Sequence, residues 1–185
     1  MAELSKAVST MSDSEKIAVG HKLRKITDKM NLSCEPFNDI DVKKDKSRDR
    51  CWGRYPNQFQ RERIAYIAAH DYGENVFVHG DLNGDNILLT PNNDLFVIDF
   101  ADAVLAPKVH EHALLALESG LDGIILRGYF DGYTVDVLAE DCFNGLLLAD
   151  YDDEMVEAFL GEPDRFQSID DLRKGLLREI GERFV

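Results

Sequence analysis

The segment HGDLNGDNILL, residues 79–89, places the oxygen-bearing side chains of Asp81, Asn83, Asp85 and Asn86 close together in the chain. Such a cluster suits a calcium loop, in which alternate residues supply oxygen ligands. It also suits a phosphoryl-transfer site, in which a carboxylate orients a hydroxyl group and nearby oxygens hold a metal ion. The two chemistries require different residues farther along the chain, so the sequence distinguishes between them.

An EF-hand calcium loop needs Gly at its sixth position and a bidentate Glu at its twelfth. Counted from Asp81, these positions hold Asn86 and Asn92. Asn lacks the backbone freedom of Gly, and its amide cannot supply two carboxylate oxygens. The apolar residues 87–89 that follow are typical of a buried strand. We therefore expect no EF-hand and no calcium-specific stabilisation.

The spacing of Asp81, Asn86 and Asp99 fits phosphoryl transfer instead. Protein-kinase catalytic loops place a base Asp five residues before a metal-binding Asn, which is the separation between Asp81 and Asn86. Asp99 lies near the end of a predicted strand, residues 95–100, so we expect its carboxylate at the end of a buried strand beside the loop. Carboxylate and amide oxygens suit Mg²⁺, and a neutral Asn limits the negative charge beside phosphates.

Two helices are predicted before this loop. The first begins at the capping box Ser12-Asp13-Ser14-Glu15, and its buried face is predicted to hold Val19, Leu23, Ile26 and Met30. Residues 31–58 are polar and are expected to be irregular. The second helix is predicted over residues 59–70, with three residues facing inward, namely Ile64, Ile67 and Ala68.

A β-rich centre and a helical remainder are predicted after residue 75. Short strands are expected at residues 76–78, 86–89 and 95–100, and the turn residues 91–94 should join the last two strands as a hairpin. After Pro107 the chain is expected to be helical, with helices at about 110–127 and 135–149 and another following Ser168. The predicted fold class is α+β and mostly helical.

The stretches VHGDLNGDNILL and LFVIDFADA resemble the signature of the aminoglycoside phosphotransferase and choline kinase family, which has a protein-kinase-like fold. VGHKLRKI resembles the family's first C-lobe helix. PKVHEHALLALE resembles the segment after the metal Asp, where a Pro and an acid precede a helix. The resemblance covers about residues 12–160 and is strongest over 76–115. It implies a kinase-like C-terminal lobe with a small β-hairpin at the catalytic loop.

The resemblance also implies roles for individual residues. Asp81 would be the catalytic base or hydroxyl-orienting group, and Asn86 and Asp99 would be the ligands of Mg²⁺. The reaction implied is transfer of the γ-phosphoryl group of ATP to a hydroxyl of a small molecule. Three further residues would be structural or supporting, namely His79, which would brace the loop, and Asp85 and Asp102 near the metal.

The sequence also departs from the family pattern. The family often has His after the Leu and Pro-Gly before the Asn, where this chain has Asn83, Gly84 and Asp85. No Gly-rich loop and no strand carrying a phosphate-pairing Lys is predicted, and Lys22 and Lys25 lie on the predicted first helix. We therefore expect residues 1–185 to form a single C-lobe-like domain without the nucleotide lobe. Two alternatives remain, a pseudokinase or binding module without turnover, and a half-enzyme whose N-lobe comes from another chain. The partner is then either a missing N-lobe or, in a homo-oligomer, a second copy of the chain.

Composition narrows the expected partners. The net charge of −14 argues against nucleic-acid binding, while 44 % hydrophobic residues suffice for a packed core. No secretory leader or membrane span is predicted, and the three separated cysteines indicate neither a disulfide framework nor a zinc site, so a cytoplasmic protein is expected. Residues 43–63 carry a net charge of +5 and residues 131–185 a net charge of −10. Solvated helix faces explain this pattern, as does a cationic substrate bound against the acidic half.

Overall fold

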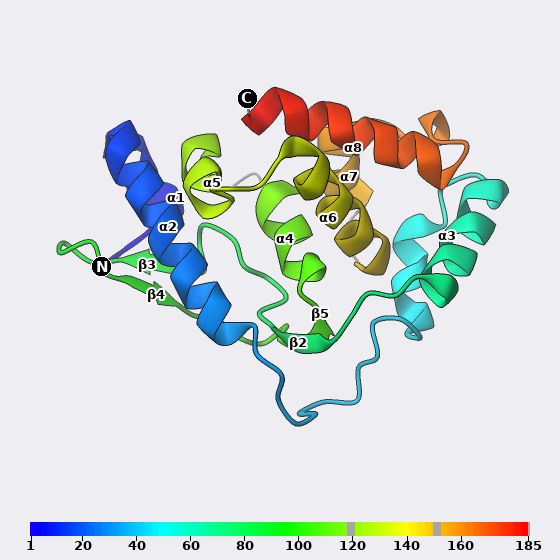
Figure 1. Ribbon diagram of the computed structural model, residues 1–185, viewed down its shortest axis with the longest axis horizontal. Helices are drawn as coiled ribbons and strands as arrows, with labels where there is room; N and C mark the ends of the chain where they lie inside the picture. The colour runs from blue at the N-terminus through cyan, green and yellow to red at the C-terminus, as the bar shows by residue number, and fades with distance from the viewer. Residues whose placement is uncertain (118–120, 150–152, 185) are drawn as a thin grey trace.

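The computed structural model describes residues 1–117, 121–149 and 153–184, which form a mostly helical α+β fold with two small antiparallel sheets (Figure 1). The strands are β1 (Ala2–Glu3), β2 (Asn75–Val78), β3 (Ile87–Leu89), β4 (Leu95–Val97) and β5 (Val104–Pro107). The α-helices are α1 (Leu4–Ala7), α2 (Asp13–Met30), α3 (Asn57–Ala69), α4 (Val109–Leu117), α5 (Gly123–Tyr129), α6 (Val135–Leu148), α7 (Asp153–Leu160) and α8 (Ile169–Phe184). Short 3₁₀ helices are η1 (Val8–Thr10), η2 (Lys46–Trp52) and η3 (Pro163–Arg165).

The segment between β2 and β3 connects the two sheets. One sheet has the strand order β1-β3-β4, and the antiparallel pairing of Ile87 with Val97 confirms the predicted hairpin. The other sheet pairs β2 with β5, so that Val78 lies opposite Val104. No strand was predicted at residues 104–107, so β5, which ends where the helical part of the chain begins, is an addition to the predicted elements. The β2–β5 pairing brings the two ends of the segment 79–103 together.

The predicted strand over residues 95–100 is too long, because β4 ends at Val97. The expectation that this strand is buried is also wrong, since Ile98 is 39 % exposed and Phe100 is 45 % exposed. Between them, Asp99 has a φ of 61°, in the left-handed region that non-glycine residues rarely adopt. The chain thus leaves the strand through a strained residue rather than continuing straight.

Helix α2 begins where its capping box predicts. The Ser12 backbone N–H donates to the Glu15 carboxylate at 2.8 Å, and the Ser12 side chain accepts from the Glu15 N–H, so both reciprocal bonds are present. Val19 and Leu23 are buried as predicted, whereas Ile26 and Met30 are half-buried. Toward the C-terminal end the buried face of α2 continues instead through Thr27, which is fully buried.

The predicted helix over residues 110–127 is in fact two helices, α4 and α5. The side chain of Asp122 caps α5 by accepting from the Ile124 N–H at 2.8 Å. α5 crosses α2 at glycines: a Cβ atom on Gly20 would lie 2.1 Å from the carbonyl oxygen of Ile125. The two helix backbones are therefore in direct contact.

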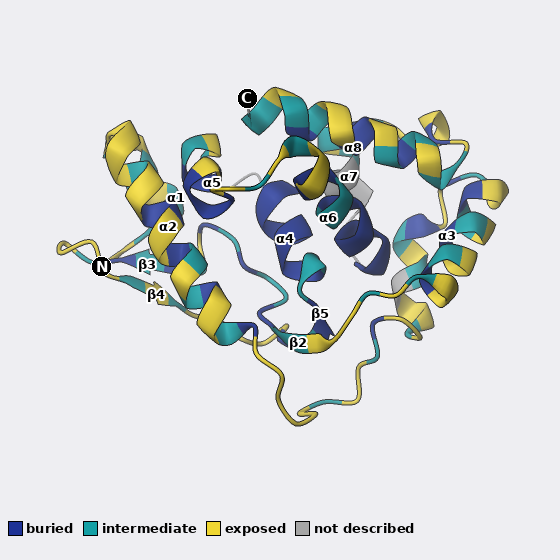
Figure 2. Cartoon of the chain, viewed as in Figure 1, coloured by how far each residue is buried: buried dark blue, intermediate teal, exposed yellow. Residues whose placement is uncertain are grey.

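The helical half is built around α4, every described residue of which from His110 to Leu117 is buried (Figure 2). α6 packs against α4 and confirms the helix predicted over 135–149, and α8 packs on α6 (Figure 1). α8 follows Ser168 as predicted, and the Ser168 N–H donates to the Asp171 carboxylate at 3.0 Å. Among the described helices, none is both long and apolar enough to cross a membrane.

The buried face of α3 differs from the prediction. Ile67 is buried, but Ile64 is 56 % exposed and Ala68 is exposed. The buried positions are Phe59, Arg63 and Ile67, at a helical spacing of four residues. The guanidinium of Arg63 donates to the Leu147 carbonyl at 2.9 Å and to Asp49 at 2.6 Å, so a carbonyl at the end of α6 and a carboxylate of η2 satisfy its hydrogen-bonding groups.

Residues 31–58 were expected to be irregular. They contain the 3₁₀ helix η2.

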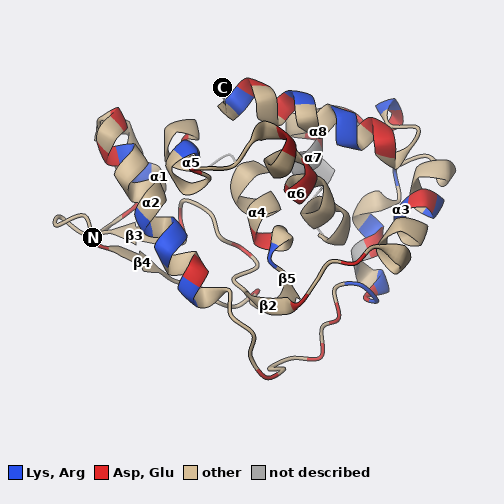
Figure 3. Ribbon diagram, viewed as in Figure 1, with Lys and Arg blue, Asp and Glu red and all other residues tan. Residues whose placement is uncertain are grey.

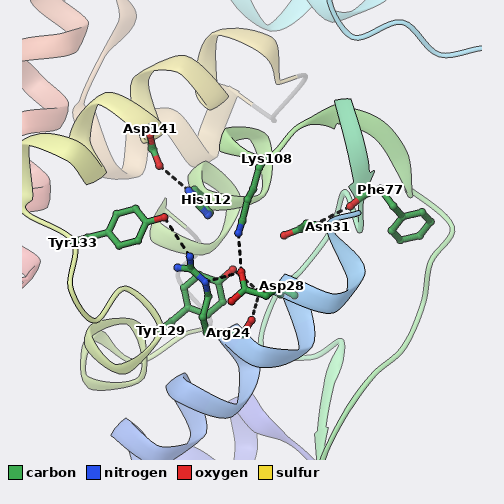
Figure 4. A network of polar contacts seen from close by, with 10 residues as sticks. Arg24, Asp28, Asn31, Phe77, Lys108, His112, Tyr129, Tyr133 and Asp141 are labelled. Atoms are coloured by element: carbon green, nitrogen blue, oxygen red, sulfur yellow. Dashed lines mark hydrogen bonds and ion pairs between the residues drawn. The ribbon is translucent and has the colours of Figure 1, made fainter. Parts of the chain in front are cut away.

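A network of polar contacts fixes the end of α2 against the β2–β5 sheet (Figure 4). Asp28 accepts from Arg24 at 2.9 Å and from Lys108, the residue after β5, at 2.7 Å. Asn31 donates to the carbonyl of Phe77 in β2 at 2.9 Å. These bonds position β2 and β5, the two strands that precede and follow the segment 79–103.

Candidate active site

The candidate active site lies in the loop between β2 and β3, residues 79–86. Asp81 and Asn86 are in direct contact there: the Asn86 side-chain nitrogen donates to Asp81 Oδ2 at 2.8 Å and to the Asp81 backbone carbonyl at 2.8 Å. Asn83 donates to the other carboxylate oxygen, Asp81 Oδ1, at 2.9 Å. Both oxygens of Asp81 are therefore oriented by amide groups, and each keeps a lone pair for a further donor.

Asp99 is held next to this pair by its neighbour in the chain. The Ile98 N–H donates to the Asn86 carbonyl at 3.0 Å, which ties the end of the hairpin to the loop. Asp99 follows directly and is exposed. The fold thus brings Asp81, Asn86 and Asp99 to one place, although Asp99 lies in a strained turn beyond the strand and not at its end.

His79 lies beneath the loop and is fully buried. Its Nε2 atom is 2.8 Å from the Ile98 carbonyl, and its Nδ1 atom accepts from the Asp81 N–H at 3.3 Å. One ring nitrogen thus contacts the backbone of the loop and the other contacts the backbone at the end of the hairpin. The imidazole therefore bridges the catalytic-loop candidate Asp81 to the hairpin end that precedes Asp99.

Glu111, in the first turn of α4, is a site residue to which the sequence assigned no role. Its side chain is fully buried, and Oε2 accepts from the His79 N–H at 2.8 Å. It also accepts from the Gly80 N–H. Burial raises the pKa of the Glu111 carboxyl to about 7, against the two backbone bonds, which favour its charged form. The signal in the sequence was an acid inside the apolar segment PKVHEHALLALE.

Gly80 is required where the loop passes over this carboxyl. It has a φ of 84°, and a Cβ atom at this position would lie 2.0 Å from the carbonyl oxygen of Asp102. Asp102 therefore contacts the loop through its backbone, and its side chain is exposed. Asp85 is also exposed, and it accepts a hydrogen bond from the Ser5 hydroxyl in the N-terminal segment.

The donor set suits a hard cation bound together with phosphates. The described hydrogen bonds of the Asn86 side chain use its nitrogen, which leaves Oδ1 as a ligand oxygen, and the Asp99 carboxylate faces solvent. Within residues 1–117, 121–149 and 153–184, no group of three or more His, Cys, Asp or Glu side chains could hold a metal ion by itself. Mg²⁺ commonly binds through one or two protein oxygens plus substrate phosphates, so the residues fit this ion.

The sequence profile of the phosphotransferase enzyme family matches residues 35–143 of the chain. This segment is more than half of the 185 residues and contains the whole loop, the hairpin, β5 and α4. The chain belongs to this family of kinase-like phosphotransferases, as the resemblance in the sequence predicted. No curated protein matches the chain.

The extent of the match differs from the extent of the predicted resemblance. Residues 12–34 and 144–160, which the resemblance was expected to include, lie outside the matched segment. Helix α2, with its VGHKLRKI stretch, is therefore not covered by the family match. The mostly helical α+β architecture agrees with the kinase-like fold of the family.

Proposed function

We propose that the chain is the C-terminal lobe of a small-molecule kinase that transfers the γ-phosphoryl group of ATP to a hydroxyl group with Mg²⁺. One observation carries the proposal: Asp81 and Asn86 are hydrogen-bonded to each other, and the Ile98–Asn86 bond holds Asp99 beside them. A hydroxyl-orienting carboxylate and two metal ligands in one loop system are the parts that phosphoryl transfer takes from this lobe.

Asp81 acts on the substrate hydroxyl. One of its carboxylate oxygens accepts the hydroxyl proton while the hydroxyl oxygen bonds to the γ-phosphorus and the bond from that phosphorus to the ADP oxygen breaks. The amide groups of Asn83 and Asn86 fix the carboxylate, so that its free lone pairs point in defined directions. Orientation of this kind is the main contribution that a protein makes to phosphoryl transfer.

Asn86 Oδ1 and the Asp99 carboxylate would hold Mg²⁺. When bound, the ion neutralises charge that develops on the phosphate oxygens. Asp99 is exposed, and its backbone is strained, with a φ of 61°. Strain of this sort is commonly found at functional sites.

The substrate we propose is small and cationic, in the class of amino sugars, choline-like amines and amino alcohols. Support comes from the net charge of −10 over residues 131–185. Helix α6 contributes Asp136, Glu140 and Asp141 and has no Lys or Arg (Figure 3). α6 packs on α4, the helix whose Glu111 accepts from the His79 N–H, so one helix separates this acidic helix from the catalytic loop.

The adenine and the cover over the phosphates belong, in this proposal, to a second lobe supplied by another segment or another chain. Titration with ATP in the presence of Mg²⁺ distinguishes a half-enzyme from a binding module. A half-enzyme binds Mg²⁺·ATP weakly alone and tightly with its second lobe. A binding module instead takes up its small-molecule ligand without any nucleotide.

The metal assignment is tested by Asp99→Asn. We expect this substitution to weaken binding of Mg²⁺·ATP at least ten-fold, because a carboxylate ligand becomes a neutral amide, with little change in fold. Isothermal calorimetry measures the affinity. The matched control is Asp94→Asn, which removes one charge from the exposed turn of the same hairpin. Equal affinities for Asp99→Asn and Asp94→Asn would contradict the assignment.

The catalytic assignment is tested by Asp81→Asn in a protein that carries the second lobe. We expect phosphotransfer to fall by about 10²–10⁴-fold, the range for loss of a positioned acid or base. The assay measures phosphotransfer from ATP to a panel of amino sugars and amino alcohols. Unchanged turnover in Asp81→Asn would refute the role of this carboxylate, and robust turnover by residues 1–185 alone would refute the lobe assignment.

A further inference from the structure

The N-terminal segment, residues 2–7, contacts the catalytic-loop candidate directly. β1 pairs with β3, with Ala2 opposite Leu89, and the side chain of Leu4 is fully buried. The Ser5 backbone N–H donates to the Gly84 carbonyl at 3.1 Å, and the Ser5 hydroxyl donates to the Asp85 carboxylate. Ser5 therefore holds the loop through both its backbone and its side chain.

Hydrogen bonds continue from this contact to the reacting end of the loop. The backbone N–H groups of Asp85 and Asn86 both donate to Asn83 Oδ1, at 2.9 Å and 3.1 Å. The Asn83 side-chain nitrogen then donates to Asp81 Oδ1 at 2.9 Å. A connected path of hydrogen bonds and adjacent residues thus leads from Ser5 to the carboxylate of Asp81.

We propose that Ser5 and Asp85 are positioning residues, which hold the loop in the conformation that keeps Asp81 and Asn86 together. Neither residue touches the reacting atoms, and the purpose of this geometry rests on the proposed function. The two residues that Ser5 bonds are Gly84 and Asp85. Because Gly has more backbone conformations available than other residues, bonds at this point restrict the loop where its backbone could otherwise vary. Displacement of a catalytic group by about 1 Å costs on the order of 10²-fold in rate.

The Ser5 hydroxyl also engages the carboxylate that departs from the family pattern. Asp85 places a negative charge one residue from the proposed metal ligand Asn86. Its Oδ1 atom accepts from Ser5, which directs the carboxylate toward the N-terminal segment. The hydrogen bond from Ser5 therefore keeps the negative charge of Asp85 from competing with Asn86 for the metal.

The hydroxyl group is tested by comparing Ser5→Thr with Ser5→Val, two variants of the same shape that differ in the O–H group. Hydrogen–deuterium exchange of the full chain without nucleotide reads out the amides of Asp85 and Asn86. We expect exchange in Ser5→Val to be about five-fold faster than in Ser5→Thr, the effect of losing one hydrogen bond. The control is Ser9→Ala, because the described hydrogen bond of the Ser9 hydroxyl goes to the Lys6 carbonyl and not to the loop, which should stay unchanged.

Variants of Asp85 complete the exchange experiment. Asp85→Asn keeps an acceptor for Ser5 and should behave like the unmodified chain, whereas Asp85→Ala should match Ser5→Val. The double variant Ser5→Val/Asp85→Ala should exchange no faster than either single variant, because all three lose the same bond. Equal exchange in Ser5→Thr and Ser5→Val would overturn the proposal, as would an equal acceleration at the amides of α6, which would indicate global loosening.

Binding of Mg²⁺·ATP separates this proposal from the proposed function. We expect Ser5→Val to bind Mg²⁺·ATP about five-fold more weakly than Ser5→Thr. Faster exchange in Ser5→Val with equal affinities in both variants would overturn the positioning role. If the unmodified chain and its two-lobed form both bind no Mg²⁺·ATP, the proposed function fails, and the exchange data still decide whether Ser5 and Asp85 tether the loop.

Discussion

Glu111 is a carboxyl group buried directly beneath the candidate catalytic loop, where it makes the stability of the protein depend on pH. The folded state raises the pKa of this group from 4.5 to about 7, because burial disfavours the charged form. Between these two pH values the folded protein keeps a proton that the unfolded chain releases. The stabilisation is therefore complete below about pH 4.5 and is lost as the pH rises through about 7.

Glu111→Gln should remove this dependence, since the amide cannot ionise and still offers an oxygen to the His79 N–H. We expect the free energy of unfolding of the unmodified chain, relative to Glu111→Gln, to fall by about 3 kcal/mol between pH 4.5 and 7.5. Urea denaturation at both pH values measures it. The exposed Glu182→Gln on α8 is the control for the substitution itself. A difference between the unmodified chain and Glu111→Gln that stays constant with pH would contradict this explanation.

At the residue scale, the sequence predicts which residues close in the chain lie together, but it does not predict contacts between distant segments. The five-residue separation of Asp81 and Asn86 and the apolar run before Asp99 suffice to group these residues, because a loop and a hairpin are local structures. Asp99's left-handed backbone is not visible in the sequence, since Asp adopts several conformations. Ser5 could not have been assigned, because it meets Asp85 only through tertiary packing, 80 residues away in the chain.

At the scale of elements, predictions succeed where the signal is local. The capping box of α2 and the turn residues of the β3–β4 hairpin mark their elements within a few positions. β5 was missed because its register depends on β2, almost 30 residues earlier, and because its sequence contains Ala and Pro. The predicted face of α3 was wrong because a count of apolar residues leaves out Arg63. This side chain can be buried because the Leu147 carbonyl and the Asp49 carboxylate accept hydrogen bonds from its guanidinium.

The crossing of α2 and α5 brings two helix backbones into close contact, and it should be sensitive to a single methyl group. Gly20→Ala would place Cβ 2.1 Å from the Ile125 carbonyl oxygen, so the helices must separate. We expect a loss of about 3 kcal/mol in the free energy of unfolding, measured in urea. Gly123→Ala in α5 is the matched control, because its Cβ would meet Arg183 at an ordinary 3.7 Å. Equal stability of the two variants would argue against a close crossing.

At the scale of the whole molecule, the charge is uneven along the chain, and much of it is locally paired. Glu140 lies 3.0 Å from Arg173, and Asp170 lies 2.6 Å from Lys174, so part of the acidity of residues 131–185 is neutralised within the helices. The remaining field is still negative, since the net charge is −14. A field of this sign concentrates cations near the surface and weakens as salt is added.

This field gives a test of the substrate class that needs no knowledge of the particular substrate. For the two-lobed enzyme at saturating Mg²⁺·ATP, we expect kcat/KM for a quaternary-ammonium alcohol to fall about five-fold between 20 and 300 mM salt. Its uncharged isostere, with tert-butyl in place of trimethylammonium, should show little change, because it feels no long-range attraction. Steady-state kinetics over a salt series measure both substrates. A parallel decline for the two would mean that salt acts on the enzyme or the nucleotide, and the acidic half would then have no part in attracting the substrate.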